Sequence, residues 1–209
     1  MTDGELSDIS AVVLAGGRGE RLGGQDKATT TLAGVTLLER VIRRVADLAG
    51  ETIVVLRPDQ EITPQLAGAS LGARIVRDVP GAGVLAAMAA GLSVMTGDCA
   101  LLVACDMPFL QLPLLRYLLT LRSGWDIVVP RLEVGLEPLH ALYHRRCLAP
   151  LGEALAQGSR RAVSFYATLH VRYVDADEIA LYDPRGISFF NVNTPDDLAQ
   201  AEAWARQEA

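Results

Sequence analysis

Residues 9–27 read ISAVVLAGGRGERLGGQDK, a short apolar run that ends abruptly in a glycine-rich segment. The run from Ala11 to Ala15 has the composition of a buried strand. The segment after it contains five glycines, Gly16, Gly17, Gly19, Gly23 and Gly24. Glycine adopts positive φ without strain and lets a ligand approach the bare backbone closely. We therefore predict a strand that runs into a long, flexible loop able to bind a ligand.

Three cations accompany these glycines, namely Arg18, Arg21 and Lys27. Together with backbone N–H groups freed by the loop, they form a pocket suited to a polyanion. Arg21 could clamp a phosphate with two parallel hydrogen bonds, and Lys27 could reach transferring phosphates as a point charge. We expect both side chains on an open, polar loop, with Gln25 and Asp26 orienting Lys27. The alternative is a glycine-rich surface turn whose cations are simply solvated.

The composition limits the classes of protein to which the chain can belong. A chain of 209 residues, half of them apolar, fits one α/β domain with a sizeable core. Its net charge of −6 argues against a general nucleic-acid binder, which would present a basic face. The longest apolar stretch, residues 84–95, is too short to span a membrane. Three cysteines without a C-x-x-C pair favour a reduced, cytoplasmic protein, and the polar residues 1–8 are expected to form a flexible N-terminus rather than a signal peptide.

Apolar runs and helical periodicities alternate along the chain. Further strands are predicted at residues 52–56, 73–77, 100–104, 126–129, 139–143 and 171–174. Helices are predicted at residues 37–50, 84–95, 112–121, 145–156, 160–169 and 195–206. The last of these helices has Thr194 as its expected N-cap and Pro195 at its first position. Strands that alternate with helices favour βαβ units and a parallel sheet, so we predict one α/β domain over residues 1–209.

Asp106 follows the apolar run 100–104 directly. In open α/β sheets the ligand crevice lies outside the carboxyl ends of the strands. Residues 14–17 leave the end of the first strand, so we expect them to face the same crevice as Asp106. A carboxylate opposite a triphosphate site is well placed to hold Mg²⁺, which takes one or two carboxylates plus phosphate oxygens. The alternative is that Asp106 only caps the helix after Pro108.

Asp78 also follows a predicted strand and precedes a glycine-rich turn. It is therefore a candidate for ligand binding, and a side-chain hydrogen bond that shapes the turn explains it equally well. The three histidines, His140, His144 and His170, are not spaced as a metal site. Cys105 is interpreted as a small buried apolar residue rather than a nucleophile.

Two familiar phosphate-binding loops do not fit residues 16–27. The dinucleotide fingerprint G-x-G-x-x-G fails at Leu22, and the P-loop pattern G-x-x-x-x-G-K-[ST] fails at Gln25. The stretch resembles L-A-G-G-x-x-x-R-(L/M)-G-G-x-D-K, the signature loop of the molybdenum cofactor guanylyltransferases within the nucleotidyltransferase superfamily. The matching residues are Leu14, Ala15, Gly16, Gly17, Arg21, Gly23, Gly24, Asp26 and Lys27.

Further motifs similar to those of that family recur along the chain. Residues 105–109, Cys-Asp-Met-Pro-Phe, resemble its C-D-x-P-(F/Y) motif, whose aspartate binds the metal ion. Asp78 matches its nucleotide-contacting aspartate. Residues 83–87, Gly-Val-Leu-Ala-Ala, depart from its G-P-L-A-G motif because the proline and the last glycine are missing. Three more landmarks are similar at residues 138–143, 158–161 and 190–195, so the resemblance spans residues 13–198.

The resemblance implies a Rossmann-like nucleotidyltransferase fold, with a mostly parallel central sheet flanked by helices. It implies transfer of GMP from GTP to molybdenum-carrying molybdopterin, with Mg²⁺ on Asp106 and release of pyrophosphate. Arg21, Lys27 and Asp106 would be the catalytic residues. The implied nucleotide-binding residues are Leu14, Ala15, Gly16, Gly17, Lys27, Asp78 and Asp106. Such a role also implies transient contacts with other cofactor-biosynthesis or acceptor proteins.

The resemblance places the acceptor near Arg160, Arg161, Asn191 and Asn193. From the residues alone, the two arginines could equally cap a helix, and the two asparagines could be hydrogen-bonding loop residues. Guanylyl transfer has three alternatives: a related nucleotidyltransferase that uses CTP or a sugar phosphate, a non-catalytic nucleotide-binding module, and a Rossmann-type oxidoreductase.

We expect the protein to select guanine. Guanine offers two donors on its Watson–Crick edge, the N1–H and the exocyclic amine, which exposed backbone carbonyls of residues 14–17 could accept. Adenine presents an acceptor at N1 and would leave those carbonyls facing a lone pair, at about 1–3 kcal/mol for each unpaired group. The absence of a side chain at Gly17 is expected to leave room for a purine.

Overall fold

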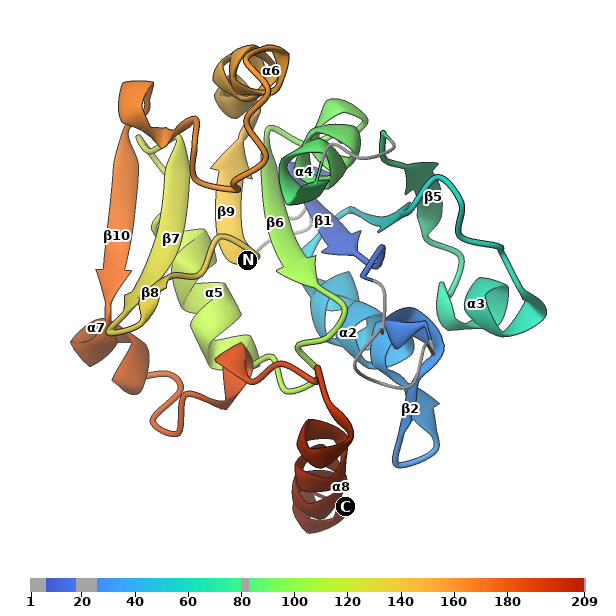
Figure 1. Ribbon diagram of the computed structural model, residues 1–209. Coiled ribbons are helices and arrows are strands. Elements are labelled where there is room, and N and C mark those ends of the chain that lie inside the picture. Colours follow the sequence, from blue (N-terminus) through green and yellow to red (C-terminus); the bar gives the residue numbers. More distant parts are fainter. Residues whose placement is uncertain (1–6, 18–25, 80–82, 209) are drawn as a thin grey trace.

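A central sheet organises the computed structural model, which describes residues 7–17, 26–79 and 83–208 (Figure 1). Within these residues the sheet has eight strands in the order β10-β7-β9-β6-β1-β4-β5, with β8 paired to β7. The strands are β1 (Ile9–Leu14), β4 (Glu51–Leu56), β5 (Arg74–Arg77), β6 (Cys99–Ala104), β7 (Ile127–Leu132), β8 (Gly135–Leu136), β9 (His140–His144) and β10 (Val171–Asp175). The predicted α/β fold with a mostly parallel sheet is confirmed.

The strand order reverses between β1 and β6. The chain adds β4 and then β5 on one side of β1, and afterwards crosses to the other side to form β6. Both β1 and β6 are buried along their whole length and pair in parallel, with Val12 beside Leu102. At such a reversal, ligands bind outside the carboxyl ends of the strands. The topology therefore places a crevice after Leu14 and Ala104.

Helices cover both faces of the sheet (Figure 1). One face carries α2 (Leu37–Val45) and α5 (Leu112–Thr120), and the other carries α4 (Gly83–Ser93) and α6 (Leu148–Ala156). The result is a layered arrangement with one apolar core on each side of the sheet. In the part of the chain that the structure describes, no helix has the length and apolarity needed to cross a membrane.

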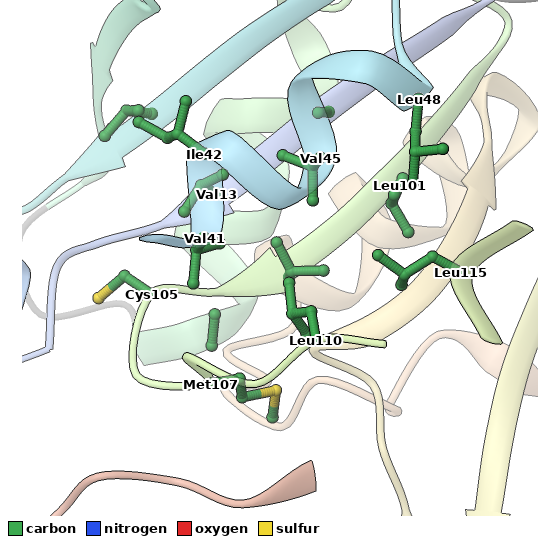
Figure 2. Packing of buried hydrophobic residues seen from close by; sticks show 14 of the residues in the cluster. Val13, Val41, Ile42, Val45, Leu48, Leu101, Cys105, Met107, Leu110 and Leu115 are labelled. Carbon is green, nitrogen blue, oxygen red and sulfur yellow. The ribbon is translucent and has the colours of Figure 1, made fainter. Parts of the chain in front are cut away.

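The core beneath α2 shows how the apolar pattern becomes structure. Figure 2 shows Val41 and Val45 of α2 in one cluster with Val13 of β1 and Leu101 of β6. Four of the five buried apolar residues of α2 recur at helical spacing on the face that meets the sheet, and the fifth, Leu37, packs in a separate cluster with Ala201 and Ala205. The helix starts at Thr36, whose side chain accepts a hydrogen bond from the third residue of the helix. The N-cap at Thr36 and the burial of the apolar face thus both favour a helix at this position.

The C-terminal segment returns to the beginning of the chain. The hydroxyl of Thr194 accepts a hydrogen bond from the N–H of Asp197 at 3.1 Å, which confirms the predicted cap of α8 (Pro195–Glu208). α8 packs on the hairpin formed by β2 (Thr31–Leu32) and β3 (Val35–Thr36). This packing brings the residues just before α8 close to those that follow the glycine-rich segment.

In the second half of the chain one strand departs from the parallel order, and one sequence-based expectation is wrong. β9 runs antiparallel to both β6 and β7, because the connection from β7 to β9 is a short hairpin with β8, whereas a parallel crossover needs a dozen or more residues. The segment 160–169 is not a helix and contains only the 3₁₀ turn η5 (Tyr166–Thr168). Its apolar spacing serves instead to bury two aromatic rings, and the hydroxyls of Tyr166 and Tyr143 are 2.6 Å apart.

The sequence-based assignment also missed several short elements. These are α3 (Pro64–Ala69), α7 (Ala176–Ala180), the β2–β3 hairpin, β8, and the 3₁₀ turns η2 (Lys27–Thr29) and η6 (Ile187–Phe189). The predicted helices at 37–50 and 145–156 each include a 3₁₀ turn, η3 (Ala46–Leu48) and η4 (Arg145–Cys147). Elements this short carry too few residues to show a periodicity.

Candidate active site

A cleft of about 670 Å³ lies at the carboxyl ends of β1, β4 and β6. It opens at the reversal of strand order, where the sequence predicted a crevice. Among the described residues its lining comprises Leu14, Gly16, Gly17, Lys27, Arg57, Pro58, Asp59, Asp78, Val79, Gly83, Val84, Ala87, Ala104, Cys105, Asp106, Leu139 and Asn191. Of the predicted nucleotide-binding residues, Ala15 alone is absent from this lining, since it is completely buried. Arg21 lies outside the described residues.

Lys27 and Asp106 form an ion pair on the wall of this cleft. The ammonium nitrogen of Lys27 is 2.7 Å from Oδ2 of Asp106 and also donates a hydrogen bond to Oδ1 of Asn193. The side chains of Lys27 and Asp106 are only 12% and 17% exposed. The interpretation of Asp106 as a helix cap is wrong, because α5 begins after Gln111. The expectation that Lys27 lies on an open loop is also wrong, because the side chain is held in the site.

Two local features place these charged groups. Asp26 caps η2 by accepting a hydrogen bond from the N–H of Ala28 at 3.0 Å, so it fixes the turn from which Lys27 projects. The carbonyl of Asp106 accepts a hydrogen bond from the N–H of Val192 at 2.9 Å, which brings the segment before α8 against the site. The expected orienting role of Asp26 is therefore supported by geometry, and Asn193 reaches Lys27 by the same packing.

The backbone carbonyls of residues 14–16 are already paired. The carbonyl of Leu14 accepts from the N–H of Cys105 at 3.0 Å. The carbonyl of Ala15 accepts from the side-chain amide of Gln60 at 3.2 Å, and that of Gly16 accepts from the guanidinium of Arg57 at 3.0 Å. The expectation that these three carbonyls are unpaired is therefore wrong, while selection of guanine by this stretch stays a prediction, because a carbonyl oxygen has two lone pairs. Sequence reasoning missed Arg57 and Gln60, because a turn that follows a strand gives no pattern that distinguishes them.

The two described glycines of this segment, Gly16 and Gly17, differ in how closely their neighbours approach. A Cβ at Gly16 would lie 3.1 Å from Cγ and 3.2 Å from the backbone nitrogen of Arg57. A Cβ at Gly17 would lie 3.4 Å from Cδ of Lys27, so the lysine stem runs along this glycine. A side chain is thus sterically tight at Gly16, whereas at Gly17 it would make only ordinary contact with Lys27.

Asp78 faces the cleft from the end of β5. Its Oδ1 is buried and has no hydrogen-bond partner among residues 7–17, 26–79 and 83–208. Burial raises the pKa of Asp78, and the positive charge of Arg57 partly opposes that shift. A buried acceptor without a donor is costly in the empty cleft, so a ligand that carries N–H or O–H groups would relieve it.

Of the four predicted acceptor residues, Asn191 lines the cleft and Asn193 bonds Lys27, whereas the two arginines are not among the lining residues. The side chain of Asn191 donates to the carbonyl of Phe189 at 3.0 Å. Arg160 and Arg161 are exposed, and a Cβ at Gly83 would lie 3.2 Å from Cβ of Arg160. Arg160 therefore stands beside the first turn of α4. The interpretation of the two arginines as the start of a helix is wrong, because the segment is irregular.

The residues present fit a magnesium ion that a triphosphate brings with it. Among the described residues no group of three or more His, Cys, Asp or Glu side chains could hold a metal ion alone. Mg²⁺ does not need such a cage, because it keeps several waters and combines one or two carboxylates with phosphate oxygens. Asp106 supplies a carboxylate, and the ammonium of Lys27 at 2.7 Å shows that positive charge is stabilised at this position.

Comparisons with known proteins agree with this geometry. Residues 11–172 match the family described as the MobA-like NTP transferase domain. The "Probable molybdenum cofactor guanylyltransferase" of Pelotomaculum thermopropionicum is 34% identical over 201 residues, which cover 96% of this chain and 95% of the relative. The "Molybdenum cofactor guanylyltransferase" of Desulfosudis oleivorans is 32% identical over 199 residues, covering 95% and 96%. The crystal structure of molybdopterin-guanine dinucleotide biosynthesis protein A from Archaeoglobus fulgidus has a TM-score of 0.80 at 30% identity, covering 95% of this chain and 99% of that one.

Proposed function

The chain belongs to the MobA-like NTP transferase family, and we propose that it transfers GMP from GTP to molybdenum-carrying molybdopterin and releases pyrophosphate. The observation that carries the proposal is the Lys27–Asp106 pair beside the glycine segment, at the reversal of strand order. Guanylyl transfer is favoured over the use of CTP or of a sugar-phosphate acceptor, because the relatives named above are guanylyltransferases. The domain that performs it extends over the whole chain.

In this proposal the first half of the chain binds GTP. The triphosphate lies along Gly16 and Gly17, whose lack of side chains lets phosphate oxygens reach the backbone. Lys27 neutralises phosphate charge as a point charge, and Arg21 clamps the leaving pyrophosphate. Leu14 packs on the nucleoside. Ala15 is buried and contributes by holding the backbone of the two glycines in place.

Asp78 is proposed to select the base. A carboxylate can accept hydrogen bonds from both the N1–H and the exocyclic amine of guanine, and Asp78 has a buried oxygen that lacks a donor among the described residues. Adenine has no N1–H, and cytosine has no donor at the corresponding ring nitrogen. In this proposal a side chain accepts the hydrogen bonds of guanine that the sequence analysis assigned to backbone carbonyls.

The chemistry is an in-line displacement at the α-phosphorus. An oxygen of the acceptor's terminal phosphate forms a bond to the α-phosphorus, while the bond to the oxygen that bridges to the β-phosphate breaks and its electron pair leaves with pyrophosphate. The attacking phosphate is already ionised, so no general base is needed. Asp106 would hold Mg²⁺, which when bound would supply neutralisation of phosphate charge. The protein contributes positioning and electrostatic stabilisation through Lys27, Arg21 and the glycine segment.

The acceptor is proposed to enter from the side of the cleft that Asn191 lines. Arg160 and Arg161 attract its phosphate, and Asn191 and Asn193 offer amide groups to its polar edges. Asn193 already bonds Lys27, so it links the acceptor side to the nucleotide side. We place the reaction in the cytoplasm, with transient contacts to the proteins that deliver the acceptor or take the product.

The test is a turnover assay with molybdenum-carrying molybdopterin and α-labelled GTP. The expected result is label in the dinucleotide product and one pyrophosphate released per transfer, both dependent on Mg²⁺. Parallel reactions contain α-labelled CTP, or a sugar phosphate in place of molybdopterin. Faster transfer in either of those reactions would contradict guanylyl transfer and support the alternative.

A further inference from the structure

We propose that Gln60 is a positioning residue whose buried amide joins the two ends of the glycine-rich segment and thereby fixes Lys27 in the active site. The proposal rests on the proposed function, because it assigns a role in triphosphate binding. Gln60 is only 3% exposed and lies in the turn after β4, outside every motif identified in the sequence.

The side chain of Gln60 makes three hydrogen bonds. Its Nε2 donates to the carbonyl of Ala15 at 3.2 Å and to Oδ2 of Asp26 at 2.6 Å. Its Oε1 accepts from the N–H of Arg57 at 3.1 Å. Both amide protons and the amide oxygen are thus engaged, by residues that line the cleft or are adjacent in sequence to lining residues.

These partners stand at the two ends of the segment. Ala15 comes directly before Gly16 and Gly17, and Asp26 comes directly before Lys27. One side-chain amide therefore bridges the entry and the exit of the loop. Fixing Asp26, and with it Lys27, before the triphosphate arrives removes conformational freedom of the lysine that binding would otherwise have to restrict.

The link to Lys27 runs through the cap of η2. Oδ2 of Asp26 bonds Gln60, while Oδ1 accepts from the N–H of Ala28 and so caps the turn that begins at Lys27. That turn aims the ammonium at Asp106, 2.7 Å away. Without Gln60 the carboxylate of Asp26 loses a donor and is free to rotate away from the cap.

Gln60 is itself held firmly. The guanidinium Nη1 of Arg77 donates to the backbone carbonyls of Arg57, Pro58 and Gln60 at 2.8, 3.1 and 2.9 Å. The backbone that carries the amide is therefore anchored to the end of β5. A fixed amide can impose a geometry on the loop, whereas a mobile amide would merely follow it.

The first experiment compares the ligands GTP and GMP. Gln60→Met keeps the length of the side chain and removes all three hydrogen bonds, and Gln60→Ala is the second variant. The matched control is Gln65→Ala, since exposed Gln65 donates to the carbonyl of Thr29 at 3.1 Å on the same turn. Calorimetry with Mg²⁺ should show the GTP dissociation constant raised about tenfold in both Gln60 variants, as for loss of a hydrogen bond to a charged group, with GMP affinity changed less than about twofold. Gln65→Ala should leave both affinities unchanged.

The second experiment reads the position of Lys27 directly. Lys27 is the only lysine in the chain, so acetylation with an amine-specific reagent and mass spectrometry report on this residue and the N-terminal amine alone. We expect Gln60→Met to raise the acetylation rate of Lys27 severalfold, with the N-terminal amine as internal reference. Gln60→Glu, which replaces the donor with a second carboxylate facing Asp26, should regain GTP affinity as the pH falls and its carboxyl group becomes protonated.

The outcomes separate the two proposals. An equal loss of GTP and GMP affinity in a folded Gln60→Met protein, or an unchanged acetylation rate of Lys27, would overturn the role of Gln60. Unchanged GTP binding in both Gln60 variants would do the same while leaving the proposed function intact. Failure of the unmodified protein to bind GTP at all would instead overturn the proposed function and the role of Gln60 with it.

Discussion

Two ion pairs of equal length stand at the carboxyl edge of the sheet, one in each half. Lys27 and Asp106 are 2.7 Å apart in the cleft beside β1 and β6, with side chains 12% and 17% exposed. Arg131 and Asp175 are also 2.7 Å apart, across the ends of β7 and β10, with side chains 52% and 51% exposed. The outer pair is bidentate, with a second hydrogen bond of 3.0 Å from Nη2 of Arg131 to Oδ2 of Asp175, whereas Lys27 contacts a single oxygen of Asp106. The two pairs differ most in their contact with water.

Exposure decides what each pair can do. Water and salt screen the outer pair, so it contributes little to stability. The inner pair keeps two charges largely out of water, where electrostatic interactions are stronger and each charge depends on a partner. A phosphate or metal ion that enters the cleft changes those partners. The half of the sheet that contains β1 and β6 thus holds its ion pair in a fixed, partly buried position, whereas the pair at β7 and β10 lies on the surface.

The largest expected effect comes from the aspartates of the two pairs. Asp106→Asn should lower guanylyl transfer about 10²–10³-fold, as for loss of a preorganised electrostatic group, and should keep the fold because the change is nearly isosteric. Asp175→Asn is the matched control and should keep normal turnover. Initial rates and far-UV circular dichroism check both variants. Normal turnover in a folded Asp106→Asn protein would remove the distinction between the pairs.

The half of the sheet that contains β9 should respond most to acid. His140 is fully buried, neither ring nitrogen has a partner among the described residues, and burial lowers its pKa from 6.5 to about 4. The unfolded chain therefore binds a proton that the folded chain does not. The contribution of neutral, buried His140 to the free energy of unfolding is fully present above pH 6.5. It is lost as the pH falls toward 4, by about 3 kcal/mol in total.

His140→Leu removes this titration and should flatten the decline in stability between pH 6.5 and 4. Urea unfolding at pH 7 and pH 4.5 measures the difference, with exposed His170→Leu as the control. An equal pH dependence in His140→Leu and the unmodified protein would show that another group is responsible.

The cations of the two pairs give the next comparison. Lys27→Ala should lower transfer by about 1.5–3 kcal/mol in activation free energy, or about 10–150-fold, as for loss of a hydrogen bond to a charged group. It should also lower stability by more than a surface change does, because Asp106 loses its partner. Arg131→Ala should change both quantities far less, because water and salt screen the exposed pair. Equal effects of the two substitutions would return Lys27 to the class of solvated surface charges.

A smaller effect is expected at the base. The protein should prefer GTP over ATP and CTP at least tenfold, and GTP over ITP, which lacks the exocyclic amine. Asp78→Asn should reduce the discrimination between GTP and ITP, because an amide cannot accept two donors at one edge. Dissociation constants for each nucleotide, at fixed Mg²⁺ and salt, measure this discrimination in the unmodified protein and in the variant. Retained GTP-over-ITP discrimination in Asp78→Asn would move base selection to another group.

The smallest effect is expected at the proposed acceptor site. Arg160→Ala should raise the KM for molybdopterin about two- to fivefold and leave the dissociation constant of GTP unchanged, since an exposed charge contributes about 0.2–1 kcal/mol. A change in GTP binding instead would place Arg160 in the nucleotide half of the cleft.

Much of the half of the sheet that contains β1 and β6 was predictable from sequence. The apolar runs before Gly16 and Asp106 are buried on both faces. A strand of this kind can be recognised from its continuous apolar sequence, without knowledge of the neighbouring strands. The rule that ligands bind at the carboxyl ends of parallel strands then located the cleft. The cap at Thr194 followed from residue type and spacing, because the hydrogen bond is local.

The sequence alone determined which residues carry charge and which strands are buried, because those properties depend on composition and on near neighbours. Tertiary structure alone decided that Lys27 lies between Asp106 and Asn193, that Gln60 bridges Ala15 and Asp26, and that β9 runs antiparallel. These contacts join residues far apart in the chain, and their partners are selected by how the layers pack. A hydrogen bond between distant residues leaves no periodic trace in a sequence, and so the geometry of the site emerges only when the sheet is assembled.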